Sequence, residues 1–193
     1  LKKTNKKVRV IAGKFRGLRL KSVGSTPANK SLRPTTDRVR ENLFNILAGG
    51  KYGNILDGAR VLDMFSGTGI LGIEAISRGA SHATLFEKCA STFKLIQDNI
   101  KLTNTVNEIN VINTNVMHLE QCKTEPFNLV FIDPPYQKNF GKPALERALE
   151  FGWLSVGALI VWEESASPEV PKEFEWLDEK KYGKTILTFL TNP

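Results

Sequence analysis

The chain has 193 residues, of which 41% are hydrophobic, and this suits one domain with a substantial core. Its sequence has no apolar run long enough to span a membrane, and its basic amino end lacks the apolar centre of a signal peptide. Two cysteines without metal-binding spacing argue against a metal site and fit a reducing cytoplasm. The sequence begins with Leu1 rather than Met, so we expect residues to precede it.

The charge is unevenly distributed along the chain. The net charge is +7, yet residues 1–40 hold thirteen Lys or Arg against one acid, so the remainder is net acidic. This asymmetry is typical of a polyanion-binding arm on an acidic body, with a disordered solubilising tail as the alternative. Residues 9–20, RVIAGKFRGLRL, alternate apolar and basic side chains around two glycines, which predicts a β-hairpin with one basic face.

The next segments predict a loop and then a helix. Residues 22–36 are rich in Ser, Gly, Pro and Thr and should form a loop that carries Arg33 outward. Thr36 or Asp37 can cap a helix that extends to about Leu47 and has one apolar and one polar face.

From residue 59 onward, short apolar runs alternate with helical patterns. The predicted strands are 59–65, 82–87, 109–113, 127–133 and 157–164, and the predicted helices are 69–80, 89–103, 116–121 and 142–151. Such alternation predicts an α/β fold of parallel βαβ units in a doubly wound sheet. Residues 174–190 predict a closing hairpin.

Residues 63–72, DMFSGTGILG, read as a strand end followed by a glycine turn that opens a helix. Gly67 and Gly69 permit a tight turn and close approach of a ligand. The glycines also match GxGxxG, and Glu87 ends the next strand as a ribose-binding acid would, so an NAD-dependent oxidoreductase is one interpretation. However, Asp63 would repel the phosphates of a dinucleotide and favours a cationic ligand such as S-adenosylmethionine. A merely polar strand end is the alternative for Asp63.

Residues 127–136, FNLVFIDPPY, form a buried-strand pattern that stops abruptly at two prolines. The stiff tetrapeptide leaves Asp133, the Pro134 carbonyl and the Tyr136 ring at a strand's carboxyl end, where open α/β sheets bind ligands. A plain turn with Tyr136 in the core is the alternative. Phe140 either packs in the core or covers a bound base.

These motifs resemble those of Rossmann-like S-adenosylmethionine-dependent methyltransferases that modify exocyclic amines. With RVIAGKFRGLRL and RPTTDRVRENLFNIL (residues 33–47) added, the chain from about Val8 to Leu190 is similar to the RsmD family of small-subunit ribosomal RNA guanine-N2 methyltransferases. DPPY is shared with DNA adenine methyltransferases, so the family assignment rests mainly on the amino-terminal motifs and the spacing. The resemblance implies a mostly parallel seven-stranded sheet with an antiparallel last strand, S-adenosylmethionine as cofactor, and ribosomal RNA or the assembling small subunit as partner.

The resemblance also implies individual roles at a cofactor site. Asp63 would contact the methionine amino group, and Gly67 and Gly69 would line the cofactor. Glu87 would accept from both ribose hydroxyls. Asn115 would accept from the adenine amine, at a position where the family usually has Asp.

At the substrate site, Asp133 and the Pro134 carbonyl would accept the two N–H groups of the base amine, and Tyr136 would stack on the flipped base. The predicted RNA contacts are Arg16, Arg33, Arg38 and Arg40. An ion pair with Glu41 is the alternative for the arginines near the helix.

We therefore predict a monomeric, cytoplasmic enzyme that methylates N2 of a guanine in small-subunit ribosomal RNA, with no metal. Residues 1–35 would form a basic, RNA-binding hairpin and loop extension, and residues 36–193 the methyltransferase domain. A DNA adenine-N6 methyltransferase is the nearest alternative, although so short a chain has little room for a sequence-reading domain. An NAD-dependent oxidoreductase would leave DPPY unexplained, and an RNA-binding module without activity would leave Asp63 and Glu87 unexplained.

Overall fold

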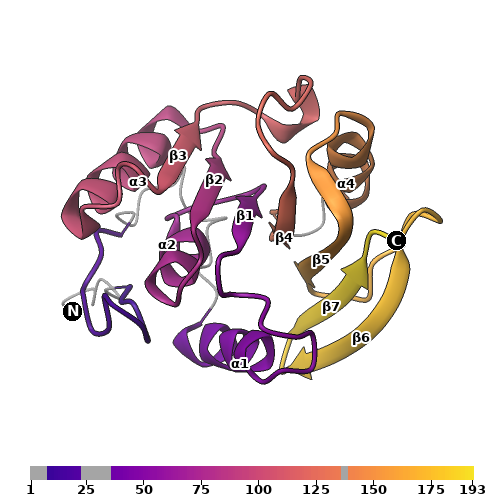
Figure 1. Ribbon diagram of the computed structural model, residues 1–193, viewed down its shortest axis with the longest axis horizontal. Coiled ribbons are helices and arrows are strands. Elements are labelled where there is room, and N and C mark those ends of the chain that lie inside the picture. The colour runs from indigo at the N-terminus through magenta and orange to yellow at the C-terminus, as the bar shows by residue number, and fades with distance from the viewer. Residues whose placement is uncertain (1–7, 23–35, 136–138) are drawn as a thin grey trace, which may run out of the picture.

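The computed structural model of the chain describes residues 8–22, 36–135 and 139–193. Its helices are α1 (Asp37–Ala48), α2 (Ile70–Ser77), α3 (Ala90–Thr103), the 3₁₀ helix η2 (Val116–His118) and α4 (Gly141–Glu150). Its strands are β1 (Arg60–Asp63), β2 (His82–Phe86), β3 (Ile109–Ile112), β4 (Phe127–Ile132), β5 (Leu154–Glu164), β6 (Glu175–Tyr182) and β7 (Thr185–Thr191). Strands and helices alternate up to β5, as predicted, and β6 and β7 form the closing hairpin (Figure 1).

The strands form one seven-stranded sheet in the order β3-β2-β1-β4-β5-β7-β6. Strands β1 to β5 pair in parallel, and β7 is antiparallel to both of its neighbours. The predicted fold class is therefore confirmed, including the antiparallel last strand. Because β1 and β4 are neighbours although they are far apart in sequence, the order of the strands reverses beside β1, which is where doubly wound sheets bind ligands.

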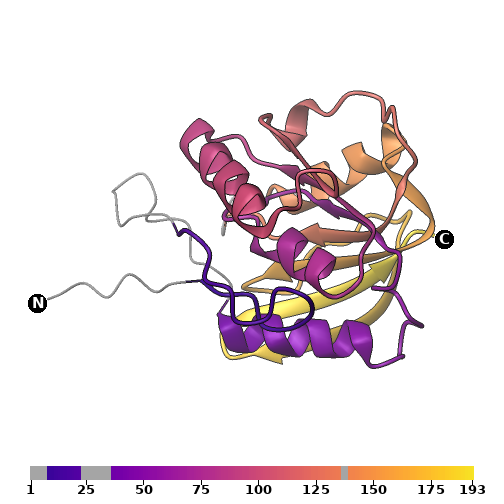
Figure 2. The same cartoon turned by 60° about the vertical axis from the view of Figure 1, so that its left-hand side comes forward.

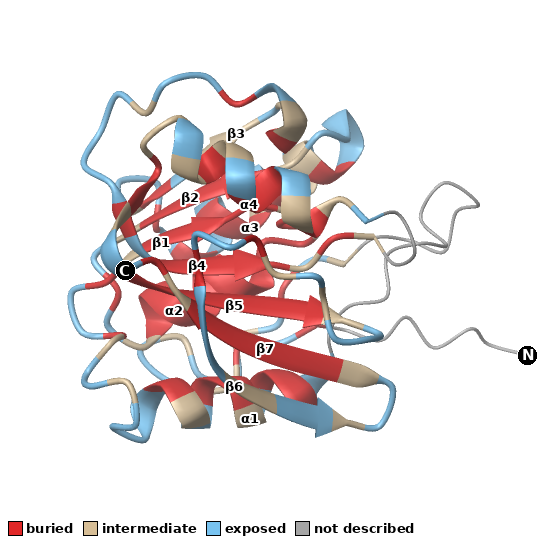
Figure 3. Cartoon of the chain, turned by 90° about the vertical axis from the view of Figure 1, so that its right-hand side faces the viewer, coloured by how far each residue is buried: buried red, intermediate tan, exposed pale blue. Residues whose placement is uncertain are grey.

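Helices cover both faces of the sheet (Figure 2). One core cluster joins α1, α2 and α3 to side chains such as Val61 and Phe131, and the other joins η2 and α4 to Leu62 and Val130. Alternate residues of β1 and β4 thus enter opposite cores, as expected of strands buried on both faces. Figure 3 shows these buried strands between the helices and the more exposed edge strand β6.

The predicted helix after residue 36 is confirmed as α1. The Thr36 side chain caps it by accepting a hydrogen bond from the Val39 N–H at 3.3 Å. The buried face carries Val39, Leu43 and Leu47 as expected, but Arg40 also lies on this face.

Residues 8–20 form the short hairpin that the alternation predicted. Arg9 and Arg19 form an antiparallel bridge, and the Leu20 N–H donates to the Val8 carbonyl at 2.8 Å. Val8, Val10 and Leu20 are buried in the core beside α1 and α2, whereas Arg9 and Arg19 are exposed. The hairpin therefore has one apolar face against the body and one basic face toward solvent.

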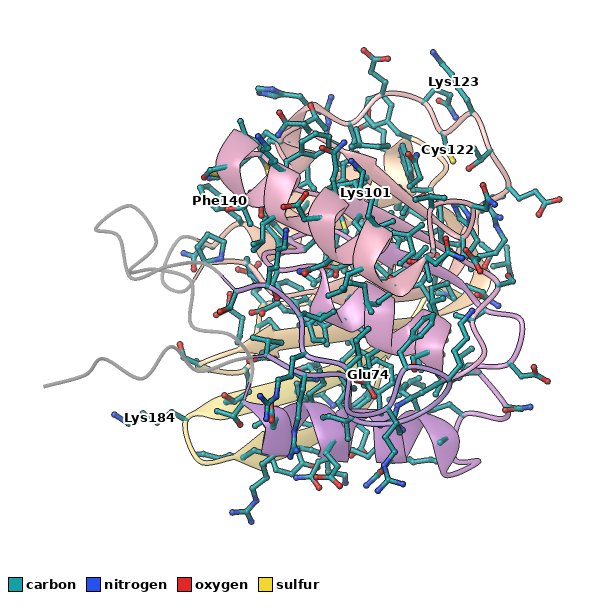
Figure 4. All side chains as sticks on the ribbon, turned by 90° about the vertical axis from the view of Figure 1, so that its left-hand side faces the viewer. Glu74, Lys101, Cys122, Lys123, Phe140 and Lys184 are labelled. Carbon is teal, nitrogen blue, oxygen red and sulfur yellow. The ribbon has the colours of Figure 1, made fainter. Side chains whose placement is uncertain are left out.

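A buried carboxylate on α2 holds the hairpin in place. Glu74 has no exposed surface and accepts hydrogen bonds from the N–H groups of Ile11 at 2.7 Å and Ala12 at 3.0 Å. It also pairs with Arg78 at 2.8 Å, and Figure 4 shows it between α2 and α1. Since charges are costly to bury unless they are paired, this cluster fixes the position of the hairpin on the domain.

Glu74→Ala should destabilise the fold by roughly 3–5 kcal/mol, because it leaves Arg78 and the partly buried N–H groups of Ile11 and Ala12 without their acceptor. Chemical denaturation monitored by circular dichroism measures this change. Glu108→Ala is the matched control, because the partly exposed Lys14–Glu108 pair, 3.5 Å long, also joins the hairpin to the body. Its loss should cost less than about 1 kcal/mol, and equal costs for the two variants would contradict the assigned role of Glu74.

Candidate active site

The register of three parallel strands gathers the predicted acids at one edge of the sheet. Asp63, the last residue of β1, is paired with Leu85 of β2 and with Phe131 of β4. Glu87 and Asp133 each follow these partners by two residues, so strand alternation places all three acids toward the same face of the sheet. Hydrogen-bonded strands lie about 4.8 Å apart, so ligands bound above β1 and above β4 are within contact of each other.

The chain after β1 forms the tight turn that the glycines predicted. Gly67 and Gly69 have φ of 53° and 75°, a region that glycine enters without strain. The Gly69 N–H donates to the Ser66 carbonyl at 2.7 Å, and the Ser66 hydroxyl donates to the Asp63 carbonyl at 3.0 Å. Helix α2 starts directly after Gly69, so the turn lies between Asp63 and the first residues of the helix.

Asp63 is a deeply buried acid. Its side chain is 1% exposed, and neither carboxylate oxygen accepts a hydrogen bond from the part of the chain that the structure describes. Burial, with nearby Glu87 as a lesser cause, raises the pKa of the Asp63 carboxyl to about 7. Buried, unpaired polar groups are rare in folded proteins and call for an explanation, and a bound cation would supply one.

Glu87 directly follows β2, and the backbone two residues further on fixes its side chain. Its carboxylate accepts a hydrogen bond from the Cys89 N–H at 2.7 Å, and burial raises the pKa of this group. The Glu87 N–H donates to the Ile112 carbonyl at 3.2 Å, which extends the pairing of β2 and β3 to this residue. The carboxylate is therefore fixed one strand away from Asp63.

Asn115 lies beyond β3 on the same side of β1 as Glu87. Its side-chain carbonyl accepts from the Met117 N–H at 3.1 Å and so caps η2, while the residue is partly exposed. The carbonyl keeps a second lone pair, and the amide group adds two donors. The geometry leaves the predicted contact with adenine available.

The DPPY motif follows β4 as predicted. Asp133 is partly buried, Pro134 is buried, and Tyr136 lies outside the described residues. Phe140 is only partly buried at the start of α4, and the Lys88 ammonium lies 5.7 Å from its ring centroid. The segment after β2 and the start of α4 thus approach each other at this edge of the sheet.

The predicted RNA contacts differ sharply in exposure. Arg16, in the hairpin turn, and Arg38, on α1, are both exposed. Arg40 is fully buried, donates to the Arg9 carbonyl at 2.7 Å and pairs with Asp37 at 3.0 Å. The prediction that Arg40 contacts RNA phosphates is corrected, because its guanidinium is enclosed between α1, the hairpin and α2. Arg33 lies outside the described residues.

The sequence reasoning missed Asn99, which links the hairpin to the glycine turn. This buried side chain accepts from the Lys21 N–H at 2.8 Å and donates to the carbonyls of Lys21 at 3.1 Å and Thr68 at 3.3 Å. The signal was present, since Asn99 lies among Ile96, Ile100 and Thr103 on the buried stripe of α3. A polar residue within such a stripe indicates a specific partner.

Residues 8–22, 36–135 and 139–193 contain no group of three or more His, Cys, Asp or Glu placed to hold a metal ion. In the same ranges, no helix has the length and apolar character needed to cross a bilayer.

Comparison with known proteins gives the family. The family described as Conserved hypothetical protein 95 matches residues 8–191. The chain belongs to this family. Ribosomal RNA small subunit methyltransferase D of Escherichia coli K12 is 37% identical over 180 residues, covering 92% of this chain and 86% of its own length. The protein of the same name from Buchnera aphidicola (Acyrthosiphon pisum) is 35% identical over 188 residues, covering 96% and 93%.

A solved structure supports the same relationship. The Escherichia coli protein yhhF, described provisionally as a methyltransferase, matches with a TM-score of 0.82 at 33% identity, covering 96% of this chain and 98% of that one. The resemblance to the RsmD family and the prediction of a methyltransferase are thus confirmed.

Asp63→Asn should raise the melting temperature of the ligand-free protein at pH 8 by about 3 °C or more, because it removes an uncompensated buried charge. The folded-state pKa lies above the unfolded one, so the cost of ionising Asp63 appears as pH rises from about 4 to about 7. The gain should therefore be small at pH 4 and full at pH 8. Scanning calorimetry at both values measures it, with exposed Asp57→Asn as control. A destabilised Asn variant at pH 8 would contradict the assignment of Asp63 as an unpaired charge.

Proposed function

We propose that this chain transfers a methyl group from S-adenosylmethionine to N2 of a guanine in small-subunit ribosomal RNA, acting as a monomer in the cytoplasm. The observation that carries the proposal is the register that pairs Asp63 with both Leu85 and Phe131. It brings a site for a cationic ligand, between Asp63 and Glu87, next to the DPP segment. The names of the relatives supply the class of RNA.

The residues around the glycine turn fit S-adenosylmethionine. This ligand carries a positive amino group and a sulfonium but no phosphate, so it compensates the buried Asp63 carboxylate. Glu87, held one strand away, has two acceptor oxygens for the ribose hydroxyls, and Asn115 can accept from the adenine amine. A dinucleotide fits less well, because its pyrophosphate would be brought close to Asp63. When bound, the ligand supplies an electrophilic methyl group on sulfur.

Asp133 and the Pro134 carbonyl would orient the amine that attacks. The lone pair of an exocyclic guanine amine is delocalised into the ring, so the nitrogen is a poor nucleophile until it becomes more tetrahedral. Two acceptors that hold its N–H groups direct the lone pair toward the methyl group. On transfer, the C–S bond of the donor would break as the C–N bond forms, and the nitrogen would lose one proton to Asp133 or to water. In this proposal Tyr136, outside the described residues, stacks on the base.

The basic face of the hairpin is the proposed RNA contact. Arg9, Arg16 and Arg19 are exposed there, and Arg38 is exposed on the adjoining helix α1. Asn99 and Glu74 fix the hairpin to the elements that carry the glycine turn. Exposed arginines position RNA through its phosphates, so residues 1–35 act as an RNA-binding extension, with Arg33 as a further phosphate contact.

Glu87→Gln should weaken S-adenosylmethionine binding by roughly 10-fold or more, because a carboxylate that accepts two hydroxyl hydrogen bonds is replaced by one carbonyl acceptor. Isothermal titration calorimetry gives the dissociation constants. Glu108→Gln, a partly exposed control at the start of β3, should bind as wild type does. Tight binding of NAD by the wild-type protein, with none of S-adenosylmethionine, would refute the proposed cofactor.

Asp133→Ala should reduce methyl transfer at least about 100-fold while leaving S-adenosylmethionine affinity within about 3-fold, because it removes an acceptor for the amine but no cofactor contact. The substrate is small-subunit ribosomal RNA, naked or in particles, from cells that lack this gene. Mass spectrometry of the nucleosides counts N2-methylguanosine. Exposed Asp57→Ala should transfer at the wild-type rate. Full activity of Asp133→Ala would rule out this mechanism.

A further inference from the structure

A cavity of about 410 Å³ lies between the start of α4 and the end of β5. Trp162, Glu164, Lys142 and Asn139 contribute to its walls, together with the loop 165–169. We call it the Trp162 cavity. Its volume is within the range of small-molecule sites, and it lies on the opposite side of β4 from Asp63 and Glu87. The proposed cofactor contacts therefore leave it unexplained.

Strand register relates this cavity to the site of the amine. Ile132, the last residue of β4, is paired with Trp162 of β5. Continued by two residues, this register would bring Pro134 level with Glu164. The two strands are hydrogen-bonded neighbours, so the backbone of Glu164 should lie about one strand spacing from the Pro134 carbonyl. In guanine, N1 is bonded to the carbon that carries the N2 amine. A base held by its amine at Pro134 can therefore present N1–H toward β5, and the proposal takes this orientation rather than the one with N3 toward β5.

The chemistry of the cavity wall suits a neutral base with hydrogen-bond donors. Glu164 is partly buried, burial raises the pKa of its carboxyl, and it accepts a hydrogen bond from the Ser165 N–H at 3.3 Å. Trp162 as a residue is 3% exposed. Its indole N–H is buried and has no acceptor among the described residues. Lys142 is paired with Glu169, so the cavity has no excess positive charge for a phosphate. A base that offers N–H donors would satisfy the Glu164 carboxylate.

We propose that the Trp162 cavity receives the flipped guanine and that Glu164 selects guanine over adenine by accepting its N1–H. This inference rests on the proposed function. Adenine has a lone pair at N1 instead of a hydrogen. Its N1 would therefore face a Glu164 carboxylate oxygen, and two hydrogen-bond acceptors would repel each other. Sites that hydrogen-bond one edge of a ligand discriminate strongly against an analogue with the wrong edge. DPPY alone binds an amine of either base, whereas Glu164 distinguishes them.

The test uses the RNA or particle that the wild-type enzyme methylates, prepared with guanine or with 2,6-diaminopurine at the methylated position. The analogue keeps the 2-amino group but has an acceptor at N1. At pH 8 the wild-type enzyme should prefer guanine by roughly 10- to 100-fold in kcat/KM. Glu164→Gln should lower kcat/KM for guanine and raise it for the analogue, because its amide can donate to N1. Glu150→Gln, exposed at the far end of α4, is the control and should keep the wild-type preference.

Several results separate this inference from the function on which it rests. Wild-type enzyme that methylates no guanine N2 would refute the proposed function itself. Normal methylation with the same base preference in wild type and Glu164→Gln would refute only the role of Glu164. Binding of S-adenosylhomocysteine verifies that each variant is folded. If Glu164→Gln is not folded, Glu164→Asp takes its place, and an unchanged rate on guanine would overturn the inference.

Discussion

The pairing of β1 with β2 on one side and β4 on the other is the constraint on which the candidate site depends. Each of these strands ends in an acid or is followed by one, and parallel pairing brings strands that are distant in sequence to a common edge. Asp63, Glu87 and Asp133 are separated by seventy residues of chain. Because β1 lies between β2 and β4, Glu87 and Asp133 each follow a strand that is about one strand spacing from the strand of Asp63. A donor site and an acceptor site can share a reaction only because of this register.

Ionisation of the buried Asp63 carboxyl is unfavourable in the ligand-free protein, and the packing of the rest of the fold offsets this cost. Asp63 is buried without a described partner, and the residues that surround it are among the most buried in the chain. Functional sites commonly hold groups whose pKa is shifted by burial, since the unfavourable charge becomes favourable once a complementary ligand binds. Glu74 is the contrasting case, because groups within the protein donate hydrogen bonds to its buried carboxylate and form an ion pair with it. The Glu74 carboxylate therefore stabilises the fold, while the Asp63 carboxylate is available to a ligand.

Much of this arrangement could be predicted from sequence, and what could not has a physical reason. Periodicity gave the alternating strands and helices, and the glycines and prolines marked where the chain turns beside β1 and β4. Arg40 was misassigned because a charged residue in a basic segment looks exposed until Asp37 and Glu74 are seen to enclose it. Asn99 and the Trp162 cavity were missed because both depend on contacts between segments that are far apart in sequence. The extent of hairpin docking depends on Glu74, whose partners no local pattern indicates.

The most direct test of the shared edge is a crystal structure of the chain with S-adenosylhomocysteine. The account predicts that the amino group of the ligand contacts Asp63, that its ribose contacts Glu87, and that its sulfur faces Asp133 across open space sufficient for a methyl group and an amine. A ligand bound elsewhere, or packed side chains between the sulfur and Asp133, would contradict the central claim that donor and base meet at this edge.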